Sequence, residues 1–361
     1  MADTLADRLL PLRERIDDID QQILALLNQR ARVAQQVGDV KKDFDVDEPI
    51  LKPEREAAIL RRLQSVNQGP FTDQAIAAVW NEIISTCRGL EEVPAVAYLG
   101  PEGSFSEQAA YEQFGHFIEP VRCASFDDVF HAVQTGQAAV GVVPVENSTE
   151  GGINRTLDLL LNASLSVLGE RSIRIEHQLL TQSGAMQGVT RITGHPQALA
   201  QCRQWLLGHY PDIPTVAASS NADAARQAST DPTMAAIAGH TAAQAWGLQA
   251  VATGIQDDAH NRTRFLMVGA MENPPSGSDK TSLILAVPNR AGAVHDMISP
   301  LARHGVSMSR LESRPARTGQ WEYYFYVDVL GHQDDDNVAR ALAELKEKVA
   351  FFKVLGSYPR Q

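Results

Sequence analysis

Apolar residues between Leu9 and Val40 recur at alternating steps of three and four, which is the spacing of a heptad seam on a helix. The seam consists of Leu9, Leu12, Ile16, Ile19, Ile23, Leu26, Val33, Val37 and Val40. No glycine or proline interrupts the stretch between Pro11 and Gly38. The pattern therefore predicts one long helix whose apolar face packs against other helices.

One position of this seam carries a charge, because Arg30 stands where the next apolar residue belongs. A charge in an apolar seam is costly without a partner, so a bound anion is expected; a snorkelling arginine at a bundle edge is the alternative. Lys41 follows about 16 Å further along the helix axis, so both side chains could hold one small dianion. Arg13 lies about 42 Å from Lys41, so it could join them only from a second, antiparallel chain. The alternative is that Arg13 and Lys41 lie on a solvated face of the helix.

The pattern changes twice along the 361 residues, which are enough for two or three domains. Residues 1–92 are expected to form three helices. In residues 95–272 short apolar runs alternate with amphipathic helices, which indicates an α/β unit with mixed sheets. After a linker at 273–278, residues 280–361 show the order βαββαβ, which is typical of a ferredoxin-like α+β domain.

The composition argues against several functional classes. The net charge of −12, from 44 acidic and 32 basic residues, disfavours nucleic acid as a partner. Three separated cysteines fit a reducing cytoplasm, and neither a signal sequence nor a membrane span is predicted. No G-x-G or Walker A motif occurs, and the histidines are too far apart for a metal site, so we expect no cofactor and no metal.

The charges of the helical region resemble those of the all-helical chorismate mutase family, which rearranges chorismate to prephenate. The resemblance implies a site lined by Arg13 of a partner subunit, Arg30, Lys41, Arg55 and Glu56. Arg13 and Arg30 would hold the substrate carboxylates. Lys41 would bind the breaking ether oxygen, and Glu56 would accept the ring hydroxyl. The reaction is pericyclic, so it depends on holding the reactive conformer and stabilising charge on that oxygen.

The chain departs from the best-known members of that family at two positions. Lys52 stands near a position where they carry aspartate. Glu91 is, by register, the third-helix residue that reaches the ether oxygen, where they carry glutamine. An ionised glutamate cannot donate a hydrogen bond, so we expect Glu91 to be protonated and the mutase to favour acidic pH. A position in a linker at 91–94, without a catalytic role, is the alternative for Glu91.

Two polar loops in the second region, 100–106 and 143–152, each follow an apolar strand and open a helix. Such helix starts can bind anions, although tight turns and helix caps use the same residues. Together with 261–265 (NRTRF), these loops resemble prephenate dehydratase. The resemblance implies two α/β lobes like periplasmic ligand-binding proteins, with the site in the cleft. Lobe one would comprise 95–172 with 252–272, and lobe two the residues between.

The resemblance to prephenate dehydratase also implies residue roles. The ring hydroxyl leaves as water while the carboxylate leaves as CO₂, giving phenylpyruvate. Thr263 would donate a hydrogen bond or proton to the departing hydroxyl, and Glu146, if protonated, is a candidate source of that proton. The candidate substrate contacts are Ser104, Asn147, Ser148, Thr149 and Arg264. A structural ion pair is the alternative for Arg264, and His195 is expected to cap or pack rather than act as a base.

The third region resembles the ACT domain, which binds amino acids. A glycine turn follows its first strand, and a Glu-Ser pair ends its second strand. The resemblance implies that L-phenylalanine binds at a dimer interface to Gly292, Ala293, Val294, Glu312 and Ser313. Val294 replaces a more usual leucine. A ferredoxin-like dimerisation module without a ligand is the alternative.

Together the three regions resemble the bifunctional enzymes that join chorismate mutase to prephenate dehydratase in phenylalanine biosynthesis. Such a chain would act on chorismate and prephenate, respond to phenylalanine, and form a homodimer or a larger homo-oligomer. A ligand sensor without turnover would explain the folds but not the matched charges. A mutase fused to a prephenate dehydrogenase is the second alternative, and the missing G-x-G argues against it.

Overall fold

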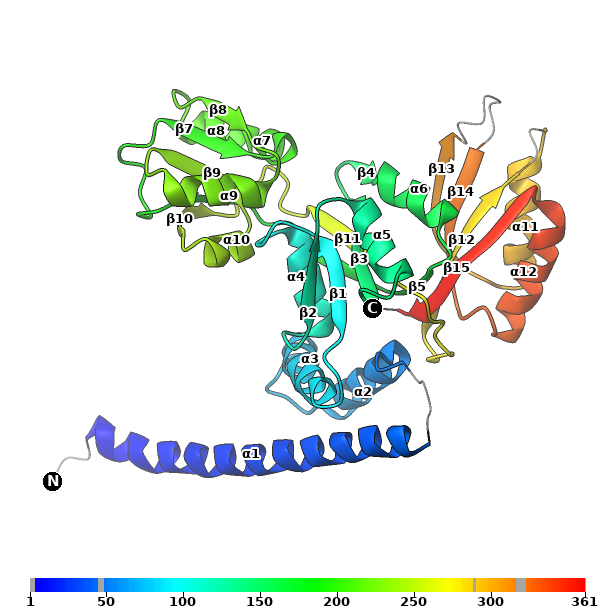
Figure 1. Cartoon of the computed structure of the whole chain (residues 1–361), viewed down its shortest axis with the longest axis horizontal. Helices are drawn as coiled ribbons and strands as arrows, with labels where there is room; N and C mark the ends of the chain where they lie inside the picture. The colour runs from blue at the N-terminus through cyan, green and yellow to red at the C-terminus, as the bar shows by residue number, and fades with distance from the viewer. Residues whose placement is uncertain (1–3, 45–48, 288–289, 316–322, 361) are drawn as a thin grey trace.

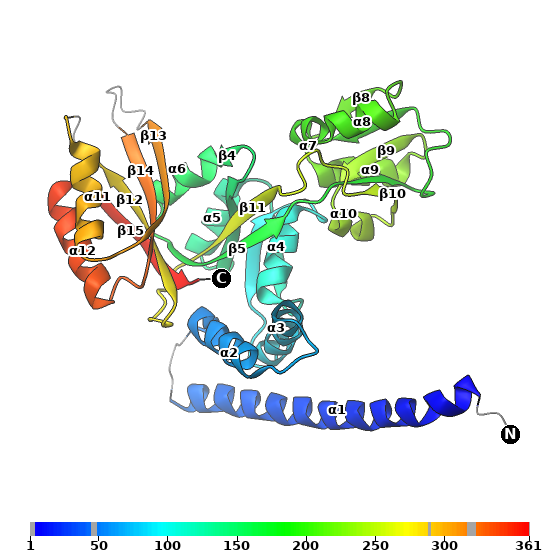
Figure 2. The same cartoon turned by 180° about the vertical axis from the view of Figure 1, so that it is seen from behind.

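The computed structural model describes residues 4–44, 49–287, 290–315 and 323–360. In chain order it contains a helical part, two α/β lobes and a C-terminal α+β part. Lobe one lies in the middle, with lobe two and the C-terminal part on its two sides (Figures 1 and 2). The helical part runs along one edge. The predicted fold class is therefore confirmed.

The predicted long helix is α1 (Leu5–Asp43), which spans 39 residues. A capping box begins it: the Thr4 hydroxyl accepts a hydrogen bond from the Asp7 N–H, and the Asp7 carboxylate accepts one from the Thr4 N–H. The seam residues from the second onward are 45–64% exposed: Leu12, Ile16, Ile19, Ile23, Leu26, Val33, Val37 and Val40. An exposed apolar stripe of this length marks an interaction surface.

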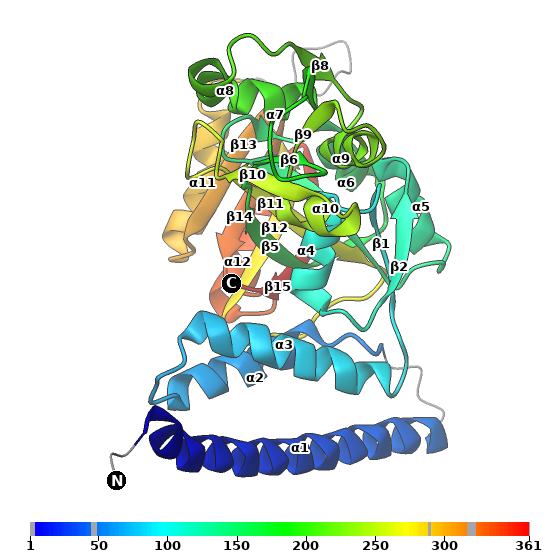
Figure 3. The same ribbon diagram turned by 90° about the vertical axis from the view of Figure 1, so that its left-hand side faces the viewer.

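The other two helices of this part are α2 (Pro53–Val66) and α3 (Asp73–Gly89). Pro53 stands at the first helical turn, where its missing N–H costs nothing. The Thr72 hydroxyl caps α3 by accepting a hydrogen bond from the Ala75 N–H. The two helices lie side by side between α1 and the lobes (Figure 3). Among the described residues, no helix has both the length and the apolar character that crossing a membrane requires.

Lobe one contains a mixed six-stranded sheet with the order β2-β1-β3-β11-β5, in which β4 pairs with β3. Its strands are β1 (Ala95–Leu99), β2 (Glu119–Cys123), β3 (Val140–Asn147), β4 (Gly151–Gly152), β5 (Ser166–Arg174) and β11 (Arg262–Gly269). Its helices are α4 (Phe105–Phe114), α5 (Phe126–Gln134) and α6 (Asn154–Asn162). The central strand β3 is almost wholly buried, as expected for its unbroken apolar sequence.

Lobe two contains a five-stranded sheet with the order β10-β6-β9-β7-β8. Its strands are β6 (Gln178–Thr181), β7 (Arg191–Gly194), β8 (Thr215–Ala217), β9 (Met234–Ala238) and β10 (Gln249–Thr253). Its helices are α7 (Pro196–Gln201), α8 (Arg203–His209), α9 (Asn221–Thr230) and α10 (His240–Ala245). The chain crosses between the lobes twice, at 175–177 and at 254–261. The expected lobe boundary at residue 252 therefore falls inside β10.

One element of lobe two differs from expectation, because the single helix expected at 197–208 is divided into α7 and α8 at Cys202. The Asp257 carboxylate accepts hydrogen bonds from the backbone N–H groups of Gln204 and Trp205. A carboxylate at this point caps a new helix start. The carboxylate comes from a segment distant in sequence, so the helical pattern alone could not reveal the break.

The C-terminal part is an antiparallel sheet with the order β13-β14-β12-β15. Its elements are β12 (Asp279–Ala286), α11 (Ala293–Arg303), β13 (Met308–Pro315), β14 (Tyr323–Leu330), α12 (Asp336–Lys348) and β15 (Phe351–Pro359). The two helices pack on one face of the sheet. The other face joins the core of lobe one through Ile284, Tyr326, Leu355 and Tyr358.

Candidate active sites

Lys41 and Glu91 lie together where α1 meets the end of α3. The Lys41 Nζ atom is 3.6 Å from Glu91 Oε2. Gly38 permits this approach, since a Cβ at that position would lie 3.1 Å from the Glu91 Cγ atom. Arg30 also contacts α3, because its Nη1 donates a hydrogen bond to the Ile83 carbonyl at 3.5 Å. The structure thus brings three of the mutase candidates to the contact between α1 and α3.

Glu56 is held by Arg88, which the sequence analysis did not single out. The Arg88 guanidinium donates to Glu56 Oε1 and to the Phe114 carbonyl of lobe one, each at 2.6 Å. The side chain of Arg88 is 5% exposed and that of Glu56 is 19% exposed. Burial raises the pKa of Glu56, and the nearby positive charge of Arg88 opposes that rise. Arg88 thus fixes the position of the Glu56 carboxylate through Oε1.

Arg13 and Arg55 are both exposed. Because α1 is one continuous helix, Arg13 lies about 42 Å from Lys41. It therefore cannot reach the pair of Lys41 and Glu91 within one chain. Arg55 precedes Glu56 in the first turn of α2, at the same end of the helical part.

The ends of β3 and β11 bring together polar residues from two sequence motifs. The Asn147 amide nitrogen donates to Thr263 Oγ1 and to Asn261 Oδ1, each at 2.9 Å. The Thr149 hydroxyl donates to the same Asn261 oxygen at 3.3 Å. We call Asn147, Thr149, Asn261 and Thr263 the Thr263 cluster. Ser148 fastens the strand ends beside it through two hydrogen bonds with the backbone of β11.

Asn147 determines the direction in which Thr263 can donate a proton. The Asn147 Oδ1 atom accepts the backbone N–H groups of Thr149 and Glu150 at 3.0 and 3.2 Å. Its amide nitrogen must therefore face Thr263, and an amide nitrogen only donates. The Thr263 hydroxyl thus accepts from Asn147 and keeps its own proton for another acceptor. This polarity suits donation to a substrate hydroxyl.

Lobe two reaches the Thr263 cluster through Gln201, the last residue of α7. Asn261 Nδ2 donates to Gln201 Oε1 at 3.1 Å, and Gln201 Nε2 donates to Glu150 of lobe one at 3.4 Å. His177, in the first crossing segment, lies 3.0 Å from the same Gln201 oxygen. Burial lowers the pKa of His177, against the effect of that hydrogen bond. The cluster therefore lies where the two lobes meet.

The loop at 100–106 holds an anion of its own. The Ser104 hydroxyl caps α4 by accepting the Glu107 N–H. The buried Glu107 carboxylate accepts hydrogen bonds from the Gly103 N–H at 2.5 Å and from the Tyr98 hydroxyl at 2.7 Å. The expected anion cradle is therefore filled by a carboxylate of the chain, and Ser104 acts as a helix cap.

His195 caps a helix, as expected. Its backbone N–H donates to Asn221 Oδ1 at 3.0 Å, and its Nδ1 accepts the Gln197 N–H at 3.4 Å at the start of α7.

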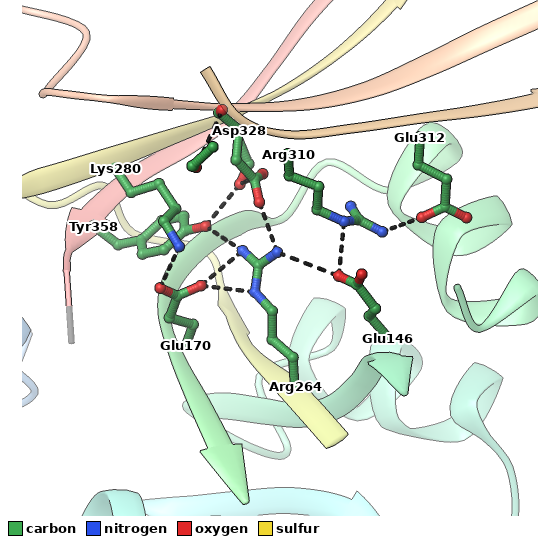
Figure 4. A network of polar contacts seen from close by, with 10 residues as sticks. Glu146, Glu170, Arg264, Lys280, Arg310, Glu312, Asp328 and Tyr358 are labelled. Carbon is green, nitrogen blue, oxygen red and sulfur yellow. Dashed lines mark hydrogen bonds and ion pairs between the residues drawn. The ribbon is translucent and has the colours of Figure 1, made fainter. Parts of the chain in front are cut away.

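Glu146 and Arg264 are turned away from the Thr263 cluster. Neighbouring residues of a strand point to opposite faces of a sheet. Glu146 precedes Asn147 on β3, and Arg264 follows Thr263 on β11. Both side chains instead face the C-terminal sheet (Figure 4). This geometry corrects the hypothesis that Glu146 supplies the proton of Thr263.

Arg264 lies at the centre of the charged network in Figure 4. It donates to Asp328 at 2.6 Å, to Glu170 at 2.7 Å and to the Tyr358 hydroxyl at 2.9 Å. Burial by itself would lower the pKa of Arg264, but these three groups raise it, so the guanidinium stays charged. Arg264 thus forms structural ion pairs, which was the alternative interpretation of this residue. It is not a substrate contact beside Thr263.

The predicted effector residues lie in two layers of the C-terminal part. Gly292, with φ +79°, begins α11, followed by the buried Ala293 and the exposed Val294. Glu312 is opposite Tyr326 on the face of the sheet that packs on lobe one, and it pairs there with Arg310. Ser313, the next residue of β13, is exposed. Within one chain, Glu312 and the glycine turn therefore belong to opposite layers.

Sequence reasoning missed Arg88, Gln201, Arg310 and Asp328. Asp328 does carry a signal, since it interrupts the apolar strand β14, and a buried charge needs a partner. Arg88 and Gln201 stand in ordinary helical patterns that give no such signal. Their partners come from other parts of the chain.

Comparisons with known proteins agree with this architecture. Three family models match: chorismate mutase type II at residues 12–92, prephenate dehydratase at 96–273 and the ACT domain at 281–347. A bifunctional chorismate mutase/prephenate dehydratase of Neisseria gonorrhoeae is 46% identical and covers 99% of both chains.

Two solved structures each match 74% of this chain. A prephenate dehydratase of Arthrobacter aurescens in complex with L-Phe is 33% identical, covers 74% of this chain and 90% of its own, and gives a TM-score of 0.68. A protein described as GqqA, a quorum quenching acylase, is 31% identical, covers 74% and 98%, and gives a TM-score of 0.67. Because the relative from N. gonorrhoeae matches over nearly the whole length, including the helical part, the chain belongs to the family of bifunctional chorismate mutase/prephenate dehydratases.

Proposed function

We propose that residues 1–92 convert chorismate to prephenate in a site completed by a second copy of the chain. Arg30 and the partner's Arg13 hold the two carboxylates, with Arg55 beside them. Lys41 binds the ether oxygen, whose charge grows as its bond to carbon breaks, and Glu91 lies beside it, where it can donate only in its acid form. Glu56 accepts the ring hydroxyl through Oε2. The contact of Lys41 with Glu91, at 3.6 Å, supports their joint role.

The partner copy packs on the seam of α1. Covering the exposed apolar residues gives the hydrophobic driving force for a homodimer. An antiparallel arrangement places Arg13 of one copy near Lys41 of the other, since the two lie at opposite ends of α1. Dimerisation therefore both buries the seam and completes the mutase site.

The dehydratase reaction, in residues 95–272, takes place at the Thr263 cluster. The carboxylate on the quaternary ring carbon of prephenate leaves as CO₂, its bonding electrons make the ring aromatic, and the ring hydroxyl departs with a proton as water. Thr263 donates the hydrogen bond that stabilises the departing hydroxyl. Asn147, Ser148 and Thr149 form the strand end beside it. The observation that carries this proposal is the hydrogen bond from Asn147, which directs the Thr263 proton outward.

The C-terminal residues 280–361 bind L-phenylalanine and reduce turnover. The complex of the A. aurescens dehydratase with L-Phe supports this assignment. The effector binds at an interface between two copies of this part. There it contacts Gly292, Ala293 and Val294 of the glycine turn, together with Glu312 and Ser313. The pairing of copies brings together residues that lie in two layers of one chain.

The test follows chorismate through the purified chain without added cofactor. We expect chorismate loss and phenylpyruvate formation, with the latter suppressed by phenylalanine. Thr263→Ala should lower dehydratase kcat at least about a hundredfold while mutase kcat stays unchanged. Thr215→Ala, at an exposed position of β8, is the matched control.

Other results would select another function. Prephenate that accumulates in the wild-type chain would leave a mutase joined to a sensor. A chain that turns over neither substrate would be a binding protein. Full dehydratase activity in Thr263→Ala would refute the role of Thr263.

A further inference from the structure

Two successive residue pairs of the β3–β11 ladder face opposite sides of lobe one. Thr263 pairs with Asn147, and Arg264 pairs with Glu146. The first pair belongs to the Thr263 cluster. The second pair, which we call the rear pair, faces the C-terminal sheet (Figure 4). A shift of the rear pair therefore moves the backbone that carries Thr263.

The C-terminal sheet holds both members of the rear pair. Arg264 Nη1 is 2.6 Å from Asp328 Oδ2 of β14, and Arg310 Nε of β13 is 2.8 Å from Glu146 Oε2. The side chains of Asp328 and Arg310 are 4% and 11% exposed. The pair of Arg264 and Asp328 is well shielded from water, so it is strong and directional, whereas the Glu146 side chain is 38% exposed. Each strand of the Thr263 cluster is thus tied to the C-terminal part by one charge pair.

Backbone pairing at the rear pair is irregular on one edge only, because Arg264 keeps its regular pairing with Ser172 of β5 and Glu146 pairs with Gly152 of β4. The register of β3 and β11 shifts between Arg264 and Phe265, directly beside it. Such a bulge interrupts the ladder and allows the strand to bend. Between β3 and β11 the side-chain anchors therefore add to a ladder that the bulge interrupts.

Packing alone does not fix the rear pair. A cavity of about 350 Å³ lies between lobe one and the C-terminal sheet. Its lining includes Glu146, Arg264, Arg310 and Asp328. Three acidic and three basic side chains line it, so its charges balance. It leaves space for the rear pair to move when an ion pair is lost.

We propose that Asp328 and Arg310 of the C-terminal part are positioning residues for the dehydratase reaction, acting through the rear pair on Thr263. The inference rests on the proposed dehydratase function. It assigns the C-terminal part a role in basal catalysis, separate from effector binding. A displacement of Thr263 by a fraction of an ångström lengthens its hydrogen bond to the departing hydroxyl and slows the reaction.

The first test replaces Asp328 by asparagine in the full chain, which keeps its shape but removes its charge. We expect dehydratase kcat to fall by roughly tenfold to a hundredfold with little change in KM for prephenate. Mutase kcat, measured on the same sample, should not change. The control is Asp127→Asn, which breaks an exposed ion pair with Arg155 between α5 and α6 and should leave both activities intact.

A double substitution separates positioning from general destabilisation. If Asp328 acts through Arg264, Asp328→Asn should lower kcat no further in an Arg264→Gln background. Additive losses would overturn the proposed route. Full dehydratase activity in Asp328→Asn would overturn the proposal itself.

Arg310→Gln keeps the test decisive if Asp328→Asn fails to fold. The same selective loss of dehydratase kcat supports the proposal, and full activity contradicts it. An equal loss of both activities also contradicts it, because the substitution then acts on folding. A wild-type chain that forms no phenylpyruvate would instead refute the proposed function, so the two failures are distinguishable.

Discussion

The guanidinium of Arg88 binds two partners, and it thereby connects Glu56 of the helical part to lobe one. One nitrogen binds the Glu56 carboxylate and the other binds the Phe114 carbonyl. Glu56 is buried enough that its pKa is raised even beside this cation. Without Arg88, the carboxylate keeps its desolvation cost and loses the charge that offsets it.

Arg88→Leu should therefore destabilise the chain by about 3 kcal/mol at neutral pH. The loss should be smaller in acid, because a protonated Glu56 no longer needs the cation. The pKa of Glu56, already raised by burial, should rise further in this variant. Glu56 protonates in the acid limb of the mutase pH profile, so this limb should move to higher pH. Denaturant unfolding and the pH dependence of kcat/KM measure both effects. Arg155→Leu, which breaks an exposed ion pair, should lower stability far less than Arg88→Leu, and an equal loss would contradict the argument.

Glu91 offers a second prediction at this scale. A glutamate beside the ether oxygen can donate a hydrogen bond only as the acid, whereas glutamine donates at any pH. Glu91→Gln should therefore extend mutase activity from acidic towards neutral pH. The comparison is kcat/KM against pH for the two chains, with Glu92→Gln as the neighbouring control. An unchanged profile would show that Glu91 does not act as a donor.

The sequence predicted the elements whose apolar residues recur with a regular period. It missed the boundary between two elements that depends on a contact with a residue far away in the chain. The heptad pattern identified α1, because a helical repeat needs no information from elsewhere. The division between α7 and α8 depends on Asp257, which approaches from the second crossing segment. Motifs likewise placed Thr263 and Asn147 together. Strand alternation, applied to the same motifs, would already have turned Glu146 and Arg264 to the other face.

The seam of α1 leads to a prediction about this element. Ile19→Glu with Ile23→Glu should produce a monomeric helical part, since two charges on the seam oppose its burial in a dimer. Mutase activity should then fall at least about a hundredfold, because the partner's Arg13 is lost. Dehydratase activity should remain. Both assays provide the test, with Gln21→Glu off the seam as the control. Unchanged mutase activity in the double variant would show that the seam does not complete the mutase site.

Across the whole molecule, lobe one is the part on which the others pack. The Arg88 contact joins it to the helical part, and residues of the C-terminal sheet complete its core. This dependence is invisible in the sequence, where linkers at 91–94 and 273–278 suggest independent units. It implies that a substitution at the junction of lobe one and the C-terminal part affects the stability of both.

Gly356 on β15 tests this dependence. It has φ +142°, and a Cβ there would lie 2.5 Å from the Val167 carbonyl oxygen of β5. Gly356→Ala combines backbone strain with a clash against main chain, which should destabilise the chain by about 3 kcal/mol. Gly136→Ala is the control, since Gly136 also has a positive φ but nothing within 4 Å of its Cβ position, and it should cost about 1 kcal/mol. Thermal unfolding compares the two. A single lowered transition for lobe one and the C-terminal part would show that they unfold together, whereas an early transition of the C-terminal part alone would show that lobe one does not need it.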